Sequence, residues 1–338
     1  MAKRFSSFED LMGAEEVAPN VYISKHPLPR GRSKSWNGYL GSVVGQAVLA
    51  AVSSSGPGFS PNSVHSLFLK PISMESEVTW KVVETATGKT FCHRNVKAYQ
   101  RNDLVYMANV SLTRKNCYSS IDAEYTAYVE RLRERRLLQS QRDRVEHEQD
   151  IDDDNEDEKV ISKPFYFETP YPDVLKKVNL EKSNMSSVLK HQLSSKDISI
   201  EVIEANEQTD EAESVLPRIN CFARLGQNSK IDNHAFQFVA LAVLLDISMF
   251  SNLQKNKSMS SSKFFAGSVN SSLNQTLYIH DTNFDCTHWF GYSVKQARSV
   301  NDRIILEAEI FNDEGFHVAT VIQEGHIGAK NLDRTMKL

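Results

Sequence analysis

A carboxylate, a hydroxyl and an amide in the second half of the chain are the first candidates for chemistry. Asp246 interrupts the apolar run FVALAVLLDISMF, where an unpaired charge would be costly. Ser272 opens a later strand-like segment, and Gln323 ends the segment HVATVIQ. These residue types serve acid–base and hydrogen-bonding chemistry. Each also has a plain alternative: a helix end facing solvent, a serine that starts a strand, and an edge-strand amide with satisfied hydrogen bonds.

Other catalytic motifs are missing from the sequence. The segment Gly41-Ser42-Val43-Val44-Gly45 places its serine one position too early for the Gly-x-Ser-x-Gly turn, which disfavours a covalent serine hydrolase. The chain has no Gly-x-Gly-x-x-Gly or P-loop motif, and its ten histidines never fall in His-Glu-x-x-His spacing. We interpret His65, His93 and His234, which lie beside apolar residues, as core or rim residues. No dinucleotide, ATP, catalytic zinc or other cofactor is therefore expected.

The elements that must position these candidates occur twice. Apolar helices are predicted over Gly38–Ser55 and from His234 to Phe250, because small and apolar residues recur there over several turns. Short β-branched or aromatic runs follow each helix. They lie at Ser63–Leu69, Glu77–Val83, Phe91–Tyr99 and Leu104–Leu112, and again at Ser272–Ile279, Trp289–Val294, Ile304–Phe311 and His317–Gln323. One unit of a helix and an antiparallel sheet is therefore expected twice.

The two copies differ at the candidate positions. When the copies are superimposed, Asp246 lies opposite Ala51 and Gln323 lies opposite Ser111, whereas both copies have a serine at the position of Ser272. A duplicated domain keeps its core pattern, so a polar residue present in only one copy needs an explanation. Asp246 and Gln323 are therefore the asymmetric pair.

Length and charge suggest the domain organisation. A chain of 338 residues favours two domains, and a formal net charge of −4 without a basic and aromatic stretch argues against nucleic acid as a partner. A charged, helix-compatible stretch from Arg131 runs into the acidic block Ile151–Lys159, which is expected to be a solvated linker. We predict an N-terminal domain over 1–128, this charged helix and linker over 129–160, and a C-terminal domain over 161–338 that carries the candidates.

Two further stretches, Glu204–Ser214 and Ser251–Ser262, are polar and are expected to be surface insertions. No apolar run approaches the roughly 20 residues that span a bilayer, so no membrane span is expected. The four cysteines stand far apart, without the close pairs of a zinc site, and are interpreted as reduced thiols of an intracellular protein.

With the repeat laid out, the sequence resembles the acyl-CoA thioesterase II family, in particular its peroxisomal branch. The resemblance rests on VVGQAVLAA, VHSLFLKP and FCHRNVKAYQRNDLVYMANVSL in the first half, and on LLDISMF, SLNQTLYIH and VATVIQEG in the second. It covers most of the chain apart from the charged insertions. It implies an α+β fold of two hotdogs, each a long helix wrapped by an antiparallel sheet, joined into one continuous sheet.

The resemblance also implies roles for the candidates. Asp246 would activate or polarise a water molecule, while Ser272 and Gln323 hold that water in line with the thioester carbonyl of a fatty acyl-CoA. Neither a metal nor a covalent intermediate would be needed. The family commonly has Asp-His beginning two positions after the hydroxyl residue, where this chain has Asn274-Gln275.

Two other functions are compatible with such a fold. A hotdog acyl-CoA hydratase usually carries an Asp and His pair near the helix, and Asp246 has no histidine close by in the sequence. A non-catalytic acyl-CoA binding protein would keep the fold without the chemistry, but the presence of all three family residues argues against it.

Localisation and assembly are further expectations. The C-terminal Met336-Lys337-Leu338 shares Lys-Leu with the Ser-Lys-Leu address read by the peroxisomal import receptor. The peroxisome is therefore expected, with the cytoplasm as the alternative. Members of the family usually associate into dimers or tetramers, which implies a homo-oligomer.

Overall fold

The computed structural model describes residues 5–29, 40–142, 161, 163, 166–178, 180, 188–193, 198–205, 218–226, 229–246 and 267–329. It divides into two compact units, one formed by residues 1–116 and 169–338 and the other by residues 117–168. Most of the stretches interpreted as surface insertions, the acidic block Ile151–Lys159 and the C-terminal Met336-Lys337-Leu338 lie outside the described residues.

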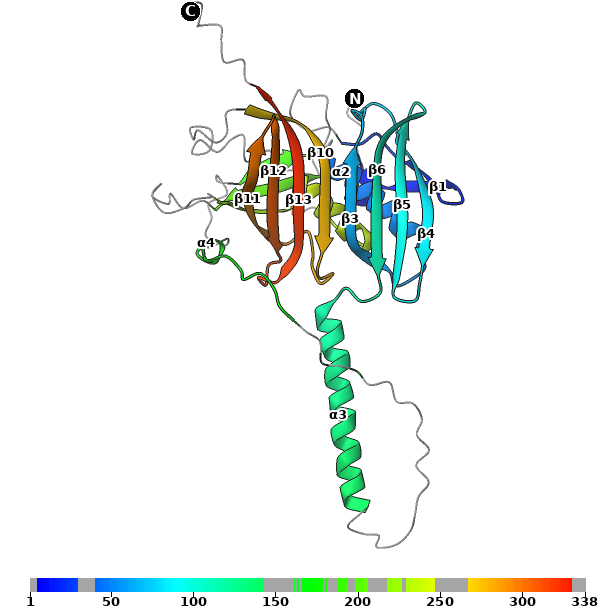
Figure 1. Ribbon diagram of the computed structural model, residues 1–338, viewed down its shortest axis with the longest axis vertical. Coiled ribbons are helices and arrows are strands. Elements are labelled where there is room, and N and C mark those ends of the chain that lie inside the picture. The colour runs from blue at the N-terminus through cyan, green and yellow to red at the C-terminus, as the bar shows by residue number, and fades with distance from the viewer. Residues whose placement is uncertain are drawn as a thin grey trace, which may run out of the picture. The chain divides into compact units, whose positions relative to one another are not determined.

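An antiparallel sheet of 13 strands forms the larger unit, in the order β1-β2-β4-β5-β6-β3-β10-β13-β12-β11-β9-β8-β7 (Figure 1). The strands are β1 (Ala14–Ala18), β2 (Val21–Ser24), β3 (Ser60–Phe68), β4 (Thr79–Thr87), β5 (Phe91–Gln100), β6 (Asp103–Thr113), β7 (Leu189–Gln192), β8 (Ser199–Glu204), β9 (Arg218–Leu225), β10 (Gly267–Ile279), β11 (Phe290–Val300), β12 (Arg303–Phe311) and β13 (His317–Ala329).

The strand order shows the repeat. Counted outward from the centre, β3-β6-β5-β4 of the first half matches β10-β13-β12-β11 of the second. The halves join where β3 pairs with β10, in a register that runs from Leu67 opposite Asn274 to Ser63 opposite Tyr278. One continuous sheet therefore serves both halves, and the predicted α+β double hotdog is confirmed.

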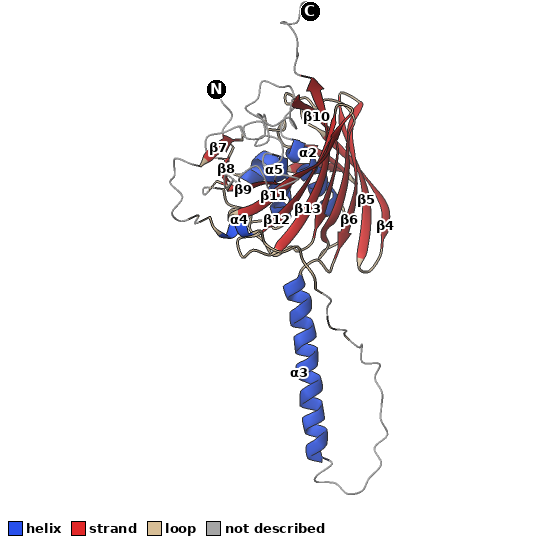
Figure 2. Ribbon diagram, turned by 60° about the vertical axis from the view of Figure 1, so that its left-hand side comes forward, coloured by secondary structure: helices blue, strands red, loops and turns tan. Residues whose placement is uncertain are grey.

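Two buried helices, α2 (Leu40–Ser53) and α5 (Ala235–Asp246), lie side by side on one face of this sheet (Figure 2). Small residues let the helices approach closely. A side chain at Gly41 would collide with the carbonyl oxygen of Ala242, and a Cβ at Gly45 would lie 2.9 Å from a methyl group of Val239. Two short helices, α1 (Phe8–Met12) and α4 (Asp173–Lys176), complete the larger unit.

The smaller unit contains one long helix, α3 (Tyr118–Arg142), whose described side chains are mostly exposed. The helix thus begins before Arg131, where the charged stretch starts. Within this unit the rings of Tyr118 and Tyr166 lie 4.1 Å apart, so residues near its first and last positions are in contact. The division into 1–128, 129–160 and 161–338 stays a prediction. Among the helices of the described ranges, none has both the length and the apolar character to cross a membrane.

Candidate active site

Ser272 and Gln323 meet on the buried face of the sheet in the second half. The Gln323 amide nitrogen Nε2 donates a hydrogen bond of 2.8 Å to Ser272 Oγ. Both side chains are buried, with 6% of Ser272 and 0% of Gln323 exposed. The pair links the neighbouring strands β10 and β13, so the structure brings together two of the three candidates.

A β-bulge turns Ser272 toward Gln323. Strand side chains alternate between the two faces, and the buried Gln275 and Leu277 define the helix-facing positions of β10. Regular alternation would therefore place Ser272 on the outer face. The register of β10 with β13 shifts between Ser272 and Asn274, and a bulge of this kind re-aims the side chain beside it.

Asp246 is the last residue of α5. The ten residues before it, from Phe236 to Leu245, are nearly all fully buried apolar residues, and the helix ends at the carboxylate. The Asp246 side chain lies outside the described residues, so its contacts with Ser272 and Gln323 stay a prediction.

Gln275 is a polar neighbour of the pair, noted from the sequence only as part of the Asn274-Gln275 departure from the family pattern and not as a site residue. It lies directly opposite Gln323, is 3% exposed, and its Nε2 donates to Gln323 Oε1 over 3.4 Å. The side-chain oxygen of Gln275, Oε1, is buried and has no hydrogen-bond partner among the described residues. Alternation backward from Leu277 is the signal that could have found it, because this places an amide on the buried face.

Asn274, the other residue of the Asn274-Gln275 pair, points away from the site. Its side-chain amide donates to Glu324 Oε2 at 2.6 Å, and Arg303 binds the second oxygen of Glu324 at 3.2 Å. These contacts tie β10, β13 and β12 together on the face opposite the helices. Asn274 therefore supports the sheet and does not line the site.

The first half has no counterpart of the Gln323 amide. The bulge in each hairpin allows the strands to be matched, with Ala98 and Tyr106 corresponding to Ile310 and Ala319. Counted from there, Gln323 corresponds to Val110. The earlier pairing with Ser111 was wrong by one residue, because Ser111 alternates with the buried Val110 and thus faces the other side of the sheet.

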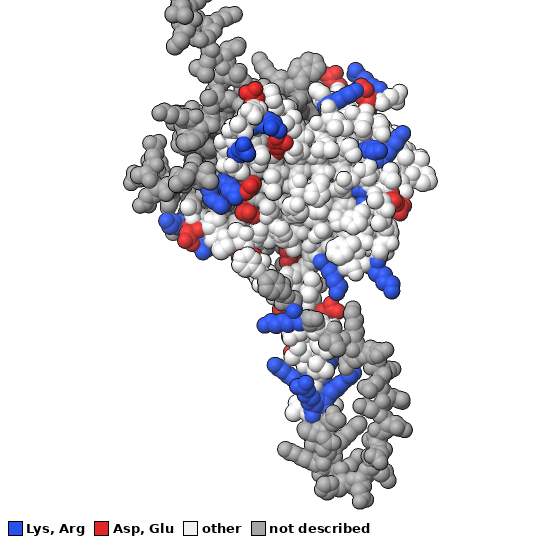
Figure 3. All heavy atoms as spheres, in the orientation of Figure 1, with Lys and Arg blue, Asp and Glu red and all other residues white. Residues whose placement is uncertain are grey.

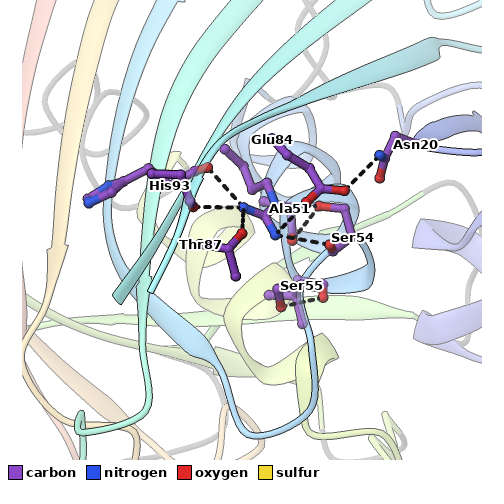
Figure 4. Close-up of polar contacts among 10 residues, drawn as sticks. Asn20, Ala51, Ser54, Ser55, Glu84, Thr87 and His93 are labelled. Carbon is purple, nitrogen blue, oxygen red and sulfur yellow. Dashed lines mark hydrogen bonds and ion pairs between the residues drawn. The ribbon is translucent and has the colours of Figure 1, made fainter. Parts of the chain in front are cut away.

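Arg94 occupies the corresponding region of the first half. Figure 4 labels Ser54, Glu84, Thr87 and His93, which surround its guanidinium. It is 2% exposed and pairs across the hairpin with Val110, as Leu306 pairs with Gln323. Its guanidinium donates to Ser54 Oγ and to the Ser54 carbonyl, at 3.3 and 3.2 Å, just past the end of α2. Further partners are the Ala86 carbonyl, Thr87 Oγ1, the His93 carbonyl and Glu84 Oε2. The first half thus uses its buried polar group to hold its own helix end.

A helix wrapped by an antiparallel sheet, repeated once, with a buried hydroxyl and amide paired in the second copy only, defines a double hotdog protein with one asymmetric site. Comparison with known protein families agrees with this class of fold. Residues 31–113 match the family described as "Acyl-CoA thioesterase N-terminal domain". Residues 194–327 match the family described as "Acyl-CoA thioesterase C-terminal domain". The chain belongs to the acyl-CoA thioesterase family and is an enzyme that acts on thioesters.

Full-length similarity extends to known proteins. The chain is 21% identical over 348 aligned residues to peroxisomal acyl-coenzyme A thioester hydrolase 1 of Saccharomyces cerevisiae, covering 95% of this chain and 94% of the yeast protein. The solved acyl-CoA thioesterase II TesB2 of Mycobacterium marinum is 15% identical, with a TM-score of 0.60 and coverage of 96% and 98% of the two chains. A hot dog fold protein of Alicyclobacillus acidocaldarius gives 12% identity, a TM-score of 0.57 and coverage of 96% and 98%. At these identities the structural matches show the shared fold.

Proposed function

We propose that the chain hydrolyses fatty acyl-CoA to free fatty acid and coenzyme A, with a water molecule activated by Asp246 and oriented by Ser272 and Gln323. The observation that carries this proposal is the buried 2.8 Å hydrogen bond between Gln323 and Ser272. It occurs only in the half whose helix ends in a carboxylate, because the first half has Val110 and Ala51 at the matching positions.

The chemistry needs an oriented water more than a strong acid. A thioester carbonyl is already electrophilic, and a thiol with a pKa near 8.5 leaves without prior protonation. Ser272 Oγ accepts a hydrogen bond from Gln323, so its own hydrogen is free to donate to the oxygen of a water molecule. In this proposal the Asp246 carboxylate takes a proton from that water as its oxygen attacks the carbonyl carbon. The carbon–sulfur bond then breaks, and the thiolate takes up the proton.

Release of free thiol from purified protein tests the proposal. Acyl-CoA esters of increasing chain length are supplied, and thiol is measured over time. We expect thiol release in proportion to enzyme, together with an equal amount of free fatty acid. Binding of acyl-CoA without thiol release would support a non-catalytic binding protein, and addition of water to an enoyl-CoA would support a hydratase. Either result would contradict the proposed reaction.

We also propose a peroxisomal location. The yeast relative is named as peroxisomal, and the chain ends in Met336-Lys337-Leu338. A fluorescent protein fused to the N-terminus, with Leu338 as the free last residue, is expected to concentrate in peroxisomes. Appending residues after Leu338 should return the fusion to the cytosol, because an import receptor reads a free C-terminus. Cytosolic fluorescence from both fusions would contradict this location.

We propose that the chain forms a homo-oligomer, because the outer face of the sheet exposes apolar side chains. Charged side chains lie mainly toward its rim in Figure 3, and partly exposed apolar residues lie on β3, β10 and β13, among them Leu67, Tyr278 and Ile322. Exposed apolar surface of this kind often marks an interface. Light scattering on the purified protein is expected to give at least twice the 38.2 kDa of one chain. A monomer mass at micromolar concentration would contradict the proposal.

A further inference from the structure

Gln275 lies at the centre of the sheet, next to the site. On β10 it stands directly opposite Gln323 of β13 on one side and opposite Ser66 of β3 on the other. All three side chains are buried on the face that the helices cover. Ser66 is already satisfied by a hydrogen bond of 2.7 Å with the hydroxyl of Tyr106. Gln275 is therefore directed to Gln323 alone.

The amide of Gln323 must be held in one orientation for the site to work. An amide has a donor end and an acceptor end, whereas a serine hydroxyl can donate or accept. Ser272 by itself would thus accept either orientation of Gln323. The Gln275 Nε2 group donates to Gln323 Oε1 and so leaves the Gln323 donor for Ser272. At 3.4 Å this contact is long, so we assign its importance to orientation more than to stability.

The side-chain oxygen Oε1 of Gln275 is able to accept a hydrogen bond that no described residue donates. This atom is buried, although buried polar atoms are normally hydrogen-bonded. Gln46, a buried glutamine of the first half, shows the contrast. Its Nε2 donates to the Met12 carbonyl and its Oε1 accepts from Trp80. Gln46 has the pattern of a structural amide, whereas Gln275 keeps an acceptor open to a polar ligand beside Ser272.

We propose that Gln275 is a positioning residue for the hydrolysis: it sets the orientation of the Gln323 amide so that Ser272 presents its hydrogen to the water. This inference rests on the proposed function. It concerns turnover and not substrate affinity, because Gln275 acts through Gln323. Misplacing a group near the reacting atoms can lower the rate by about a hundredfold, so a loss of at least about tenfold is expected when the orienting donor is removed.

The test compares Gln275→Met, Gln275→Glu and the control Gln46→Met. Gln275→Met should lower kcat at least about tenfold and leave KM within about twofold, because only the orientation of Gln323 changes. Adding Gln275→Met to Gln323→Met should cause no further loss, since the two amides act as one unit. Gln275→Glu lacks the donor when ionised, and its activity relative to wild type should rise as the pH falls and the carboxyl regains a proton. Gln46→Met should lower the melting temperature while kcat stays within twofold.

Three results would overturn the inference. If Gln275→Met has the kcat of an active wild-type enzyme, Gln275 does not position Gln323. The proposed function would then be unaffected. Equal losses in Gln275→Met and Gln46→Met would show a structural role. Absence of thiol release from the wild type would contradict the proposed function itself, and the inference with it. If Gln275→Met does not fold, the near-isosteric Gln275→Glu and its pH profile still decide the question.

Discussion

Ser272 shows how a single residue depends on local backbone geometry. The register shift in β10 lies beside it and brings its hydroxyl to the face that carries Gln323. The donor of a fully buried amide thereby gains an acceptor, and leaving such a donor unpaired costs about 1 to 3 kcal/mol. The same contact thus contributes to folding and prepares the hydroxyl for the proposed reaction.

Replacing Ser272 separates these contributions. Ser272→Ala is expected to lower kcat by about 10- to 100-fold and the free energy of unfolding by about 1 to 3 kcal/mol, because the hydroxyl is lost and the Gln323 donor is left unpaired. Ser272→Thr keeps the hydroxyl and suits a strand, so it should retain most activity. Thiol release and urea unfolding measure both effects. The strand registers match Ser272 to Pro61 of the first half, and not to Ser63 as the sequence alignment predicted. Ser63→Ala, which removes a buried serine of β3, is the control and should keep wild-type turnover.

Residue-level prediction from the sequence reached some of these features and missed others. Ser272 and Gln323 could be singled out because the repeat and the family resemblance point to them. Gln275 was not named as a site residue, although alternation from Leu277 places it on the buried face. Gln323 was matched to Ser111 because the hairpin turn is one residue longer in the second half, with residues 312–316 between the paired Phe311 and His317 but residues 100–103 between Tyr99 and Leu104. Sequence offsets alone do not reveal this difference. The contacts of the Asp246 side chain stay a prediction.

At the scale of elements, the two central helices depend on small residues where they cross. Gly41 and Gly45 of α2 leave no room for a side chain against α5. Overpacking such a contact typically costs about 1 to 3 kcal/mol, because backbone or neighbouring side chains must shift. The helices cover the site residues of the sheet, so their spacing also sets the space available there.

Alanine substitutions test this crossing. Gly41→Ala should lower the free energy of unfolding by at least about 1 to 3 kcal/mol, and Gly45→Ala by less, because its neighbour is partly a movable Val239 side chain. At Gly56 an added Cβ would meet only Arg114 Nη2, at 3.9 Å. Gly56→Ala is therefore the matched control, with little change expected. Urea unfolding followed by circular dichroism gives all three values, and equal stabilities would contradict the packing described.

The outer face of β10, β12 and β13 carries a titratable cluster. His280 donates to or accepts from Thr320 Oγ1 at 2.9 Å, and His317 pairs with Glu309 at 2.6 Å. Desolvation by the side chains packed around the ring, then the nearby charge of His317, lowers the pKa of His280 to about 4, although part of the residue is exposed to solvent. Burial acts to raise the pKa of Glu309, but hydrogen bonds from His317 and Thr320 bring it below its usual value.

This cluster predicts a loss of stability in acid. Between pH 6.5 and about 4 the unfolded chain binds a proton at His280 that the folded chain does not, so stability falls as the pH drops through this window. Glu309 acts in the same direction below pH 4.5, because its lowered pKa favours the folded state only while it is ionised. Melting temperatures across the range should fall less steeply for His280→Gln than for wild type. An identical slope would contradict the assignment to His280.

Element prediction was most successful where the pattern is strongest. The two apolar helices and the four strands that follow each one were expected, because burial imposes a clear periodicity. Three strands of the second half are longer than predicted by five or six residues at one end, so that Ser272 lies inside β10 and does not open it. The edge strands β1, β2, β7, β8 and β9 were not expected. Edge positions carry polar and charged residues such as Glu15, Lys190 and Glu201, and their pairing is decided by the sheet as a whole.

At the scale of the whole molecule, the two halves share a sheet but differ in what they do with a buried polar group. Arg94 holds the end of α2 in the first half, and Leu306 stands at the matching position in the second. That position therefore supplies no guanidinium over Gln323, and the last residue of α5 is Asp246. The two halves therefore have the same scaffold. They differ in the residues at matched positions, which give one half a structural polar group and the other half the proposed catalytic residues.

Arg94→Met is expected to lower the free energy of unfolding by at least about 2 kcal/mol, because three backbone carbonyls and two side-chain hydroxyls lose the buried guanidinium that donates to them. Turnover per folded molecule should stay within about twofold, since the proposed reaction takes place in the other half. Urea unfolding and thiol release measure the two quantities. The control is Arg114→Met, which removes an exposed arginine that lies over the Phe59 ring at 4.4 Å and should cost less. A large loss of turnover at full folding would contradict the division between halves.

The role of Asp246 is the central claim, and a single comparison tests it most directly. Thiol release from acyl-CoA is measured for wild type, for Asp246→Asn and for Asp232→Asn, which alters an exposed carboxylate near the opposite end of the same helix. General-base help contributes about 10²- to 10⁴-fold in rate, so Asp246→Asn should lose at least a hundredfold while its melting temperature is retained. Asp232→Asn should remain fully active. Full activity in Asp246→Asn would contradict the account.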